Sequence, residues 1–158
     1  MMKLYAAIFA VAIVAMFLPV EYLVSDAFRP PPNKVLTPAG VKEVAGTPLW
    51  LYPWRATVVL VTLLFAAIVA TFFTRQTGRV RWTLAFLSIT AAVFHYLTLL
   101  FTSSPPGYGV EIYPLVYVIK VGNAPPQFYL DLGQILILYA AYNVYKARAS
   151  QYTMSKFR

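Results

Sequence analysis

Hydrophobic and polar positions divide the chain into four long apolar segments joined by more polar connections. A helix needs about 20 apolar residues to cross the roughly 30 Å hydrocarbon core of a bilayer. The pattern predicts four such helices, at about residues 4–23, 56–73, 83–101 and 128–145. We therefore expect an all-α integral membrane protein, an antiparallel four-helix transmembrane bundle, in which residues 1–158 form a single polytopic membrane domain.

The first apolar segment also resembles a signal peptide, because Lys3 precedes its apolar core. No A-x-A cleavage site follows the run. We therefore predict that this segment is retained as the first membrane helix.

The connections differ greatly in length. The inner loop 74–82 is short, whereas the outer loops 24–55 and 102–127 are long and contain 11 of the 12 prolines. Within the second outer loop, Leu115–Val121 is rich in β-branched residues and too short to span the bilayer, so it is predicted to be a strand followed by a turn at Gly122-Asn123. We expect its partner in the first outer loop, at Lys34–Leu36, Gly40–Val44 or Leu49–Tyr52. The two loops would then form a small β-containing extracytoplasmic cap; two flexible loops are the alternative.

Composition supports a membrane class and limits the chemistry. Hydrophobic residues make up 60% of the chain and charged residues 11%, against about 25% in soluble domains, and the mean hydropathy is +0.66. Cysteine is absent, which excludes disulfides, thiolate metal sites and thiol catalysis. The net charge is +8, but beyond Arg75, Arg79 and Arg81 no dense basic stripe is present, so nucleic acid is not an expected partner. The expected partners are membrane lipids and other membrane protein subunits, the latter through the outer loops and helix faces.

Basic residues predict the orientation in the membrane. With both termini in the cytoplasm, the inner side carries eight of them: Lys3, Arg75, Arg79, Arg81, Lys146, Arg148, Lys156 and Arg158. The outer side carries five: Arg29, Lys34, Lys42, Arg55 and Lys120. We predict a multi-pass plasma-membrane protein with cytoplasmic N- and C-termini and a cytoplasmic tail at 146–158.

Three ionisable residues fall near the outer ends of three predicted helices: Glu21, His95 and Asp131. His95 is the only histidine of the chain and lies on a helix face with Ser88 and Ala91. Ionisable residues within the membrane are functional candidates, so the three form a candidate intramembrane polar cluster. A structural Asp131–His95 hydrogen bond, a proton or quinone site, and a His95 that faces a partner or lipid all remain open.

No cofactor or catalytic residue is assigned. A single histidine cannot supply a bis-histidine haem site, and zinc requires several nitrogen or sulfur ligands. The sequence also contains no phosphate-binding loop, nucleophile elbow or H-E-x-x-H motif. Enzymatic activity and a metal site are therefore not expected.

Large apolar residues in the outer loops are candidate partner contacts, because apolar residues outside the membrane need cover. They are Trp50, Trp54, Leu115, Tyr117 and Ile119.

Two stretches, "TPLWLYPWR" and "EIYPLVYVIKV" with the following "GNAPPQFYLDLGQILILYAAY", are similar to the tryptophan-bearing first outer loop and the second outer loop of claudin-type four-helix proteins. The resemblance implies an ordered outer cap and a role in protein contact. The cysteine pair of that family's first loop is missing from this chain.

These patterns favour a non-catalytic accessory or assembly subunit of a larger membrane protein complex, with a respiratory energy-transducing complex as the specific case. The alternatives are a self-assembling, claudin-like adhesion or junction protein and a small quinone- or proton-handling membrane enzyme that uses His95, Asp131 and Glu21. Scarce Asn and Gln, absent Cys and proline-containing loops are compatible with a thermophilic source.

Overall fold

The computed structural model describes residues 2–23, 34–37, 40–43, 47–74, 76–103 and 108–155. Within these residues the chain is mostly helical. Its helices are α1 (Met2–Phe17), the short 3-10 helix η1 (Val20–Leu23), α2 (Leu51–Phe73), α3 (Gly78–Thr102) and α4 (Leu132–Ser155). Its strands are β1 (Lys34–Thr37), β2 (Gly40–Glu43), β3 (Tyr108–Tyr113), β4 (Val116–Val121) and β5 (Gln127–Leu130).

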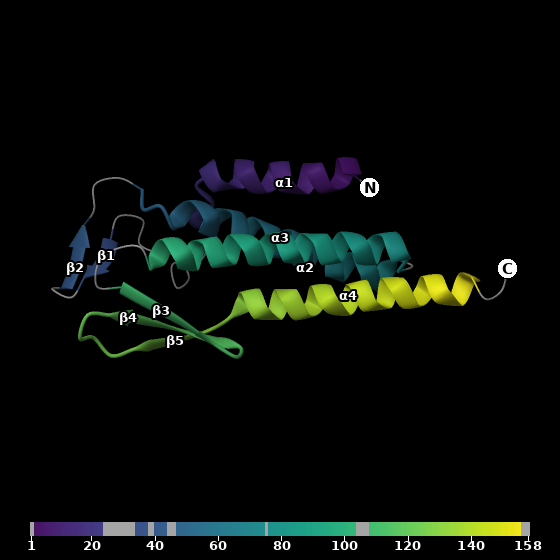
Figure 1. Cartoon of the computed structure of the whole chain (residues 1–158). Helices are drawn as coiled ribbons and strands as arrows, with labels where there is room; N and C mark the ends of the chain where they lie inside the picture. The colour runs from purple at the N-terminus through teal and green to yellow at the C-terminus, as the bar shows by residue number, and fades with distance from the viewer. Residues whose placement is uncertain are drawn as a thin grey trace.

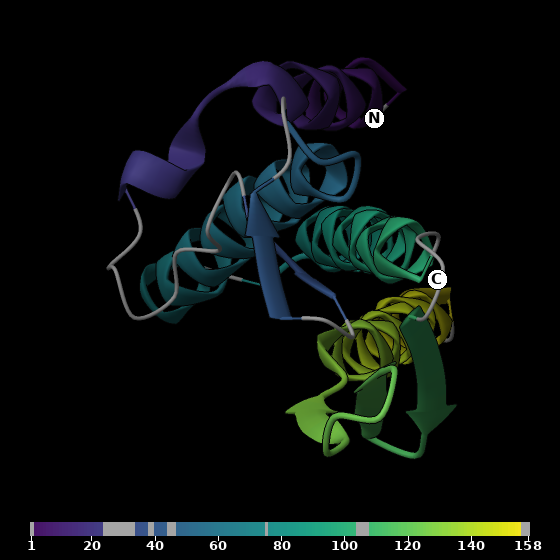
Figure 2. The same ribbon diagram turned by 90° about the vertical axis from the view of Figure 1, so that its left-hand side faces the viewer.

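The four α-helices run alternately up and down, so that each is antiparallel to its neighbour in sequence (Figure 1). Helix α3 lies between α2 and α4, and α1 packs on α2 (Figure 2). All five strands lie at one end of the helices, which we call the sheet end. At the opposite end, which we call the connection end, α1 begins, α4 ends and α2 is joined to α3.

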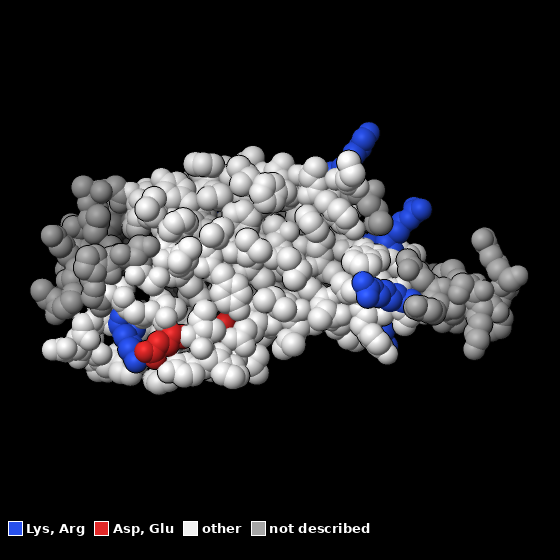
Figure 3. All heavy atoms as spheres, in the orientation of Figure 1, with Lys and Arg blue, Asp and Glu red and all other residues white. Residues whose placement is uncertain are grey.

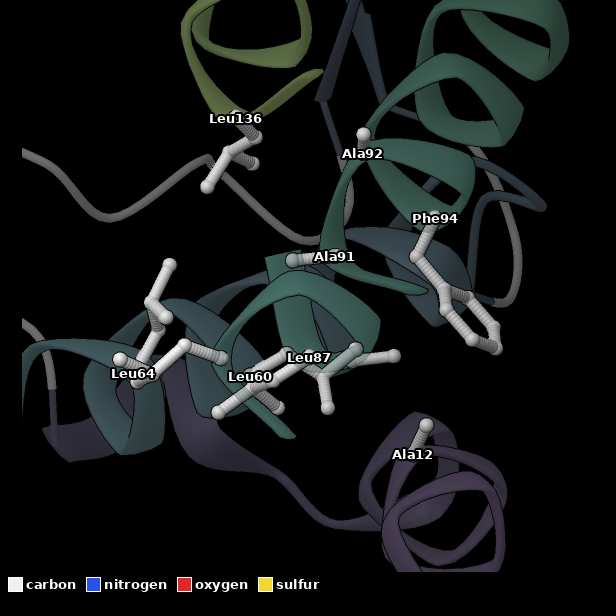
Figure 4. Close-up of a cluster of buried hydrophobic side chains, with 10 residues drawn as sticks. Ala12, Leu60, Leu64, Leu87, Ala91, Ala92, Phe94 and Leu136 are labelled. Carbon is white, nitrogen blue, oxygen red and sulfur yellow. The ribbon is translucent and has the colours of Figure 1, made fainter. Parts of the chain in front are cut away.

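Small residues of α3 allow its neighbours to approach closely. Ala91 and Ala92 are fully or almost fully buried, and Ala91 and Leu87 lie against Leu60 and Leu64 of α2 (Figure 4). Small side chains at such positions are typical of helix contacts in membranes. Leu136 from α4 and Ala12 from α1 belong to the same cluster and lie on opposite sides of α3 (Figure 4).

Two of the helices, α2 and α3, are long and apolar enough to cross a membrane. They contain 23 and 25 residues, which correspond to about 34 and 37 Å at 1.5 Å per residue. Helix α1 is also apolar but has 16 residues.

Helix boundaries differ from the predicted ones at several points. Helix α1 ends at Phe17 and the chain resumes as η1 after Pro19, because proline has no amide to donate to a continuing helix. Helix α2 begins at Leu51 rather than 56 and α3 at Gly78 rather than 83. The predicted helix start at 128 is wrong, because residues 127–130 form β5 and α4 begins after Asp131.

The strand predicted at Leu115–Val121 is confirmed as β4, and Gly122 forms the following turn with a φ of 51°. Its predicted pairing with the first outer loop is wrong: β4 pairs antiparallel with β3 on one side and β5 on the other. Strands β1 and β2 pair with each other in a separate two-stranded sheet. Pairing within one loop closes shorter chain segments and so costs less conformational entropy.

Charged side chains avoid the middle of the molecule on the face seen in Figure 3, where Lys and Arg atoms gather at the two ends. At the connection end the described basic residues are Lys3 at the start of α1, Arg79 and Arg81 at the start of α3, and Lys146 and Arg148 in α4. At the sheet end, Lys120 is paired with Glu111.

Candidate functional site

The structure brings His95 of α3 and Asp131, the residue before α4, together at the sheet end. Asp131 is completely buried and His95 is 9% exposed. The Nε2 atom of His95 lies 3.5 Å from Oδ1 of Asp131, which is longer than a hydrogen bond to a charged group. Within the described part of the chain, this buried nitrogen has no hydrogen-bond partner. An imidazole and a carboxylate therefore face each other with one polar atom unsatisfied.

The Asp131 carboxylate is held by several donors. The Tyr96 hydroxyl donates to both carboxylate oxygens at 3.3 Å, and the Gln134 backbone amide donates to Oδ1 at 3.1 Å. The side-chain amide of Gln134 donates to Oδ2 at 2.9 Å. Asp131 thus caps the N-terminus of α4, where an acidic residue satisfies free amides and interacts favourably with the helix dipole. These bonds explain how a carboxylate can be wholly buried.

Gln134 also fastens the β3–β4 turn to α4. Its Nε2 donates to the Tyr113 carbonyl at 2.7 Å, and its Oε1 accepts from the Leu115 amide at 2.9 Å. The Asp131 amide donates to the Leu115 carbonyl at 2.9 Å. Leu115 has a φ of 62°, a left-handed conformation that is unfavourable for a residue with a side chain. Contacts with α4 therefore hold a strained turn in place.

Aromatic rings surround the imidazole. Tyr96 and Tyr117 meet His95 edge to face, with ring centroids 5.5 and 5.9 Å away, and Tyr129 stacks on Tyr117 at 5.2 Å. Burial, with smaller contributions from Tyr129 and Asp131, raises the pKa of Tyr117 to about 12. Tyr117 is therefore a neutral phenol at physiological pH, and it connects the sheet to α3.

Gly133, at the first turn of α4, makes this close packing possible. A Cβ atom at this position would lie 2.6 Å from Cζ and 2.7 Å from Cε2 of Tyr96, and 2.9 Å from Cδ2 of His95. No side chain fits there without moving a ring. The absence of a Cβ thus allows α4 to bring Asp131 beside His95.

Glu21 of η1 forms a second buried pair, with Arg55 in the first turns of α2. Glu21 is 3% exposed and Arg55 9%. Arg55 Nε donates to Oε2 at 2.9 Å and Nη2 to Oε1 at 2.5 Å, a two-pronged geometry that suits guanidinium and carboxylate groups. This pair fastens the chain after α1 to α2.

Of the three predicted cluster residues, the structure thus places His95 and Asp131 together and bonds Glu21 to Arg55. Sequence reasoning missed Tyr96, Gln134, Gly133 and Arg55. Arg55 carried no specific signal, because an arginine at the end of an apolar segment can extend its charged group to water. The roles of Gln134 and Gly133 carried only local signals, such as the D-x-x-Q spacing of a helix cap in Asp131-Leu-Gly-Gln134.

The predicted partner contacts have different environments. Trp50 precedes α2, Trp54 lies within it, and both are half-buried. Leu115 is 46% exposed, whereas Ile119 is half-buried and Tyr117 packs on His95. Of the three sheet-end residues, Leu115 is therefore the one most available to another molecule.

Among the residues that the structure describes, no group of three or more His, Cys, Asp or Glu side chains could hold a metal ion. Comparison of the chain with family models, curated proteins and solved structures finds no match.

Proposed function

We propose that this protein is a membrane-embedded, non-catalytic accessory or assembly subunit of a larger membrane protein complex, with a respiratory complex as the first case to test. Its apolar surface supports membrane embedding. Only 22% of the most apolar window of α2 is buried inside the chain, which supports contact with lipid over a place in the core of a soluble domain. Large exposed side chains such as Phe9 on α1, Phe65 on α2 and Leu138 on α4 extend the apolar surface over other helices.

In this proposal all four helices cross the bilayer, and both termini are cytoplasmic in the plasma membrane. The basic residues at the connection end support this orientation by the positive-inside rule. Because the chain has no cysteine, single cysteines can be introduced to test it. A membrane-impermeant maleimide should label Lys120→Cys in intact cells and Lys3→Cys or Lys146→Cys only after permeabilisation. Labelling of Lys3→Cys in intact cells would reject the orientation.

One observation carries the subunit role: an exposed apolar edge strand is rigidly attached to a membrane helix. All four residues of β5 are exposed, and Phe128 and Leu130, which alternate to the same face, are 70% and 65% exposed. The strand leads directly into Asp131, whose contacts with Tyr96 and Gln134 fix its position. Exposed strand edges and apolar patches of this kind favour pairing with another chain.

A cross-linking experiment tests this role. A photoreactive phenylalanine analogue replaces Phe128 in the chain expressed in its native host, and cross-linked partners are identified after gentle solubilisation. We expect a stoichiometric adduct with one different membrane protein, and loss of co-purification in the double variant Phe128→Ser/Leu130→Ser. Gln127→Ser, an exposed polar change on the same strand, is the matched control and should retain the partner.

Adducts formed only between copies of this chain would overturn the subunit role and favour self-assembly as an adhesion or junction protein. No adduct at all, with unaltered co-purification in the double variant, would remove β5 as the contact.

A second candidate function, proton or quinone handling, is favoured by the His95–Asp131 geometry. A buried imidazole nitrogen without a hydrogen bond lies 3.5 Å from a fully buried carboxylate, and small movements would let the two share a proton. Glu21 would take part in this function only if it left Arg55 and moved to the His95–Asp131 pair. His95→Gln, compared with Ser88→Ala, tests it. Loss of proton uptake by vesicles that contain the protein in the first variant alone would support this candidate, and unchanged uptake would remove it.

A further inference from the structure

Strand β5 forms an open edge of the three-stranded sheet. The strand order is β3-β4-β5, so β4 covers one side of β5, and among the described residues no further strand lies on the other side. All four residues of β5 are exposed, and none is charged or a proline. Charged side chains and prolines are devices with which proteins often protect such an edge from other chains. This edge lacks both.

One hydrogen bond shows which residues of β5 face the open edge. The Asp131 amide donates to the Leu115 carbonyl at 2.9 Å, and the register of β5 with β4 continues from this pair. Hydrogen-bonded and non-hydrogen-bonded pairs alternate along an antiparallel ladder. Tyr129 therefore directs its backbone N–H and C=O groups toward β4, whereas Phe128 and Leu130 direct theirs toward the open edge.

The same two residues carry the most exposed apolar side chains of the strand. Phe128 is 70% exposed and Leu130 65% exposed. Two residues before Phe128, Pro126 has no amide hydrogen to donate, so pairing along this edge begins at Phe128. The open edge is thus short. It combines the N–H and C=O groups of two alternate residues with two large apolar side chains.

These groups together specify what covers the edge. Lipid chains would cover Phe128 and Leu130, but they cannot bond to N–H and C=O groups, which are costly to leave unsatisfied in apolar surroundings. Water would bond to the backbone groups but would leave both side chains exposed. An extended polypeptide does both, because its backbone repeats donors and acceptors with the same period and its side chains lie beside those of the strand that it joins.

The charges near the edge favour an uncharged segment. Lys120 of β4 is already paired with Glu111 of β3 at 2.6 Å. Asp131, which follows Leu130, is completely buried and bonded within the chain. A charged side chain opposite Phe128 or Leu130 would therefore compete with existing bonds for a counter-charge, whereas an apolar side chain would gain cover.

We propose that β5 binds an extended, uncharged segment of a different membrane protein subunit as the fourth strand of the sheet. Apolar side chains of that segment lie opposite Phe128 and Leu130 on the same face, and its backbone bonds to their N–H and C=O groups. The inference rests on the proposed subunit role, and adds the mode of binding and the chemistry of the partner's segment.

Residue-resolved hydrogen exchange tests the added strand. It compares the full chain alone in bilayer nanodiscs with the complex that co-purifies from the native host. We expect the amides of Phe128 and Leu130 to exchange freely in the isolated chain and at least about tenfold more slowly in the complex, which corresponds to one added hydrogen bond. The Tyr129 amide, which faces β4, should already be protected in the isolated chain and serves as the reference.

Replacing one amide by an ester separates backbone pairing from apolar contact. The α-hydroxy acid analogue of leucine at position 130 keeps the side chain but removes the outward N–H, and it should weaken retention of the partner about tenfold. The matched control is the α-hydroxy acid analogue of tyrosine at position 129, which removes an N–H that faces β4. The control should lower the melting temperature of the isolated chain more than the ester at position 130 does.

Three results would overturn the added strand. In the first, a different subunit co-purifies, but the amides of Phe128 and Leu130 exchange as fast as in the isolated chain; the subunit role would then stand without it. In the second, only copies of this chain are recovered, which would overturn the subunit role as well. In the third, both amides are already protected in the isolated chain, because lipid or the chain itself covers the edge.

Discussion

Gly133 of α4 lies so close to the Tyr96 ring that a Cβ atom would stand 2.6 Å from Cζ. We predict that Gly133→Ala destabilises the protein by about 1–3 kcal/mol, the usual cost of overpacking a filled site. The higher helix propensity of alanine offsets part of this cost. Thermal unfolding in detergent measures the change.

Gly109→Ala is the control for that substitution. A Cβ at Gly109 would meet its nearest neighbour, Cβ of Lys120, at 3.9 Å, which is ordinary contact. Its stability should remain within about 0.5 kcal/mol of the unaltered protein. If both glycine variants lose the same stability, close packing at Gly133 is not the cause.

The buried Glu21–Arg55 pair predicts a strongly non-additive pair of substitutions. Arg55→Met should cost about 3–5 kcal/mol, because it removes the guanidinium that bonds both oxygens of a buried carboxylate. Adding Glu21→Gln removes the buried negative charge that the guanidinium had balanced and should restore a large part of that loss. A double-mutant cycle of unfolding free energies measures the coupling, and simple additivity would contradict it.

The left-handed conformation of Leu115 predicts a stabilising substitution. Leu115→Gly should relieve about 1 kcal/mol of backbone strain, partly offset by the greater freedom of glycine in the unfolded chain. Loss of the half-buried side chain, which is 46% exposed, also offsets part of this gain. Limited proteolysis at increasing urea concentration measures the stability of the β3–β4 turn. The turn of Leu115→Gly should be cleaved at the same rate as that of the unaltered protein or more slowly. Pro114→Ala serves as the control, and a clearly faster cleavage of Leu115→Gly would contradict the assignment of strain.

The exposed pair of Glu111 and Lys120 predicts a pH window for the β3–β4 hairpin. Hydrogen bonds from Lys120 and Tyr113 lower the pKa of Glu111 from its ordinary 4.5, so this contribution to stability is present above pH 4.5 and is lost as the pH falls through the lower folded value. The bond to Glu111 raises the pKa of Lys120 above its ordinary 10.5, so that contribution is present below pH 10.5 and is lost as the pH rises through the folded value. The pair therefore supports the hairpin between these limits.

Carbon-13 NMR titration of the Glu111 carboxyl checks this window. Lys120→Met should move the pKa of Glu111 back toward 4.5, whereas Gln127→Ser should leave it unchanged. An identical titration in unaltered protein and Lys120→Met would contradict the ion pair in solution.

Much of the architecture follows from patterns along the chain. Apolar segments of near-membrane length predicted the helices, and the β-branched run at residues 115–121 predicted β4, because both signals are local. The ends of helices were harder to predict from the sequence, as the start of α4 shows. The apolar composition of residues 128–130 suits a helix as well as a strand, and the hydrogen bonds of β5 with β4 decide between them.

Partnerships between distant residues could not be read from the sequence. Residue spacing places His95 and Asp131 at similar distances from the outer ends of their predicted helices. That distance does not show which helices pack against each other. The contacts of α3 with α4 bring His95 and Asp131 together, and η1 turns Glu21 toward Arg55. The sequence by itself determined the long apolar helices and the concentration of basic residues at one end of them, since these depend on composition and period. Only the tertiary structure decided the pairing of buried charges, the strained turn at Leu115 and the close approach at Gly133, because each depends on the packing of elements that are remote along the chain.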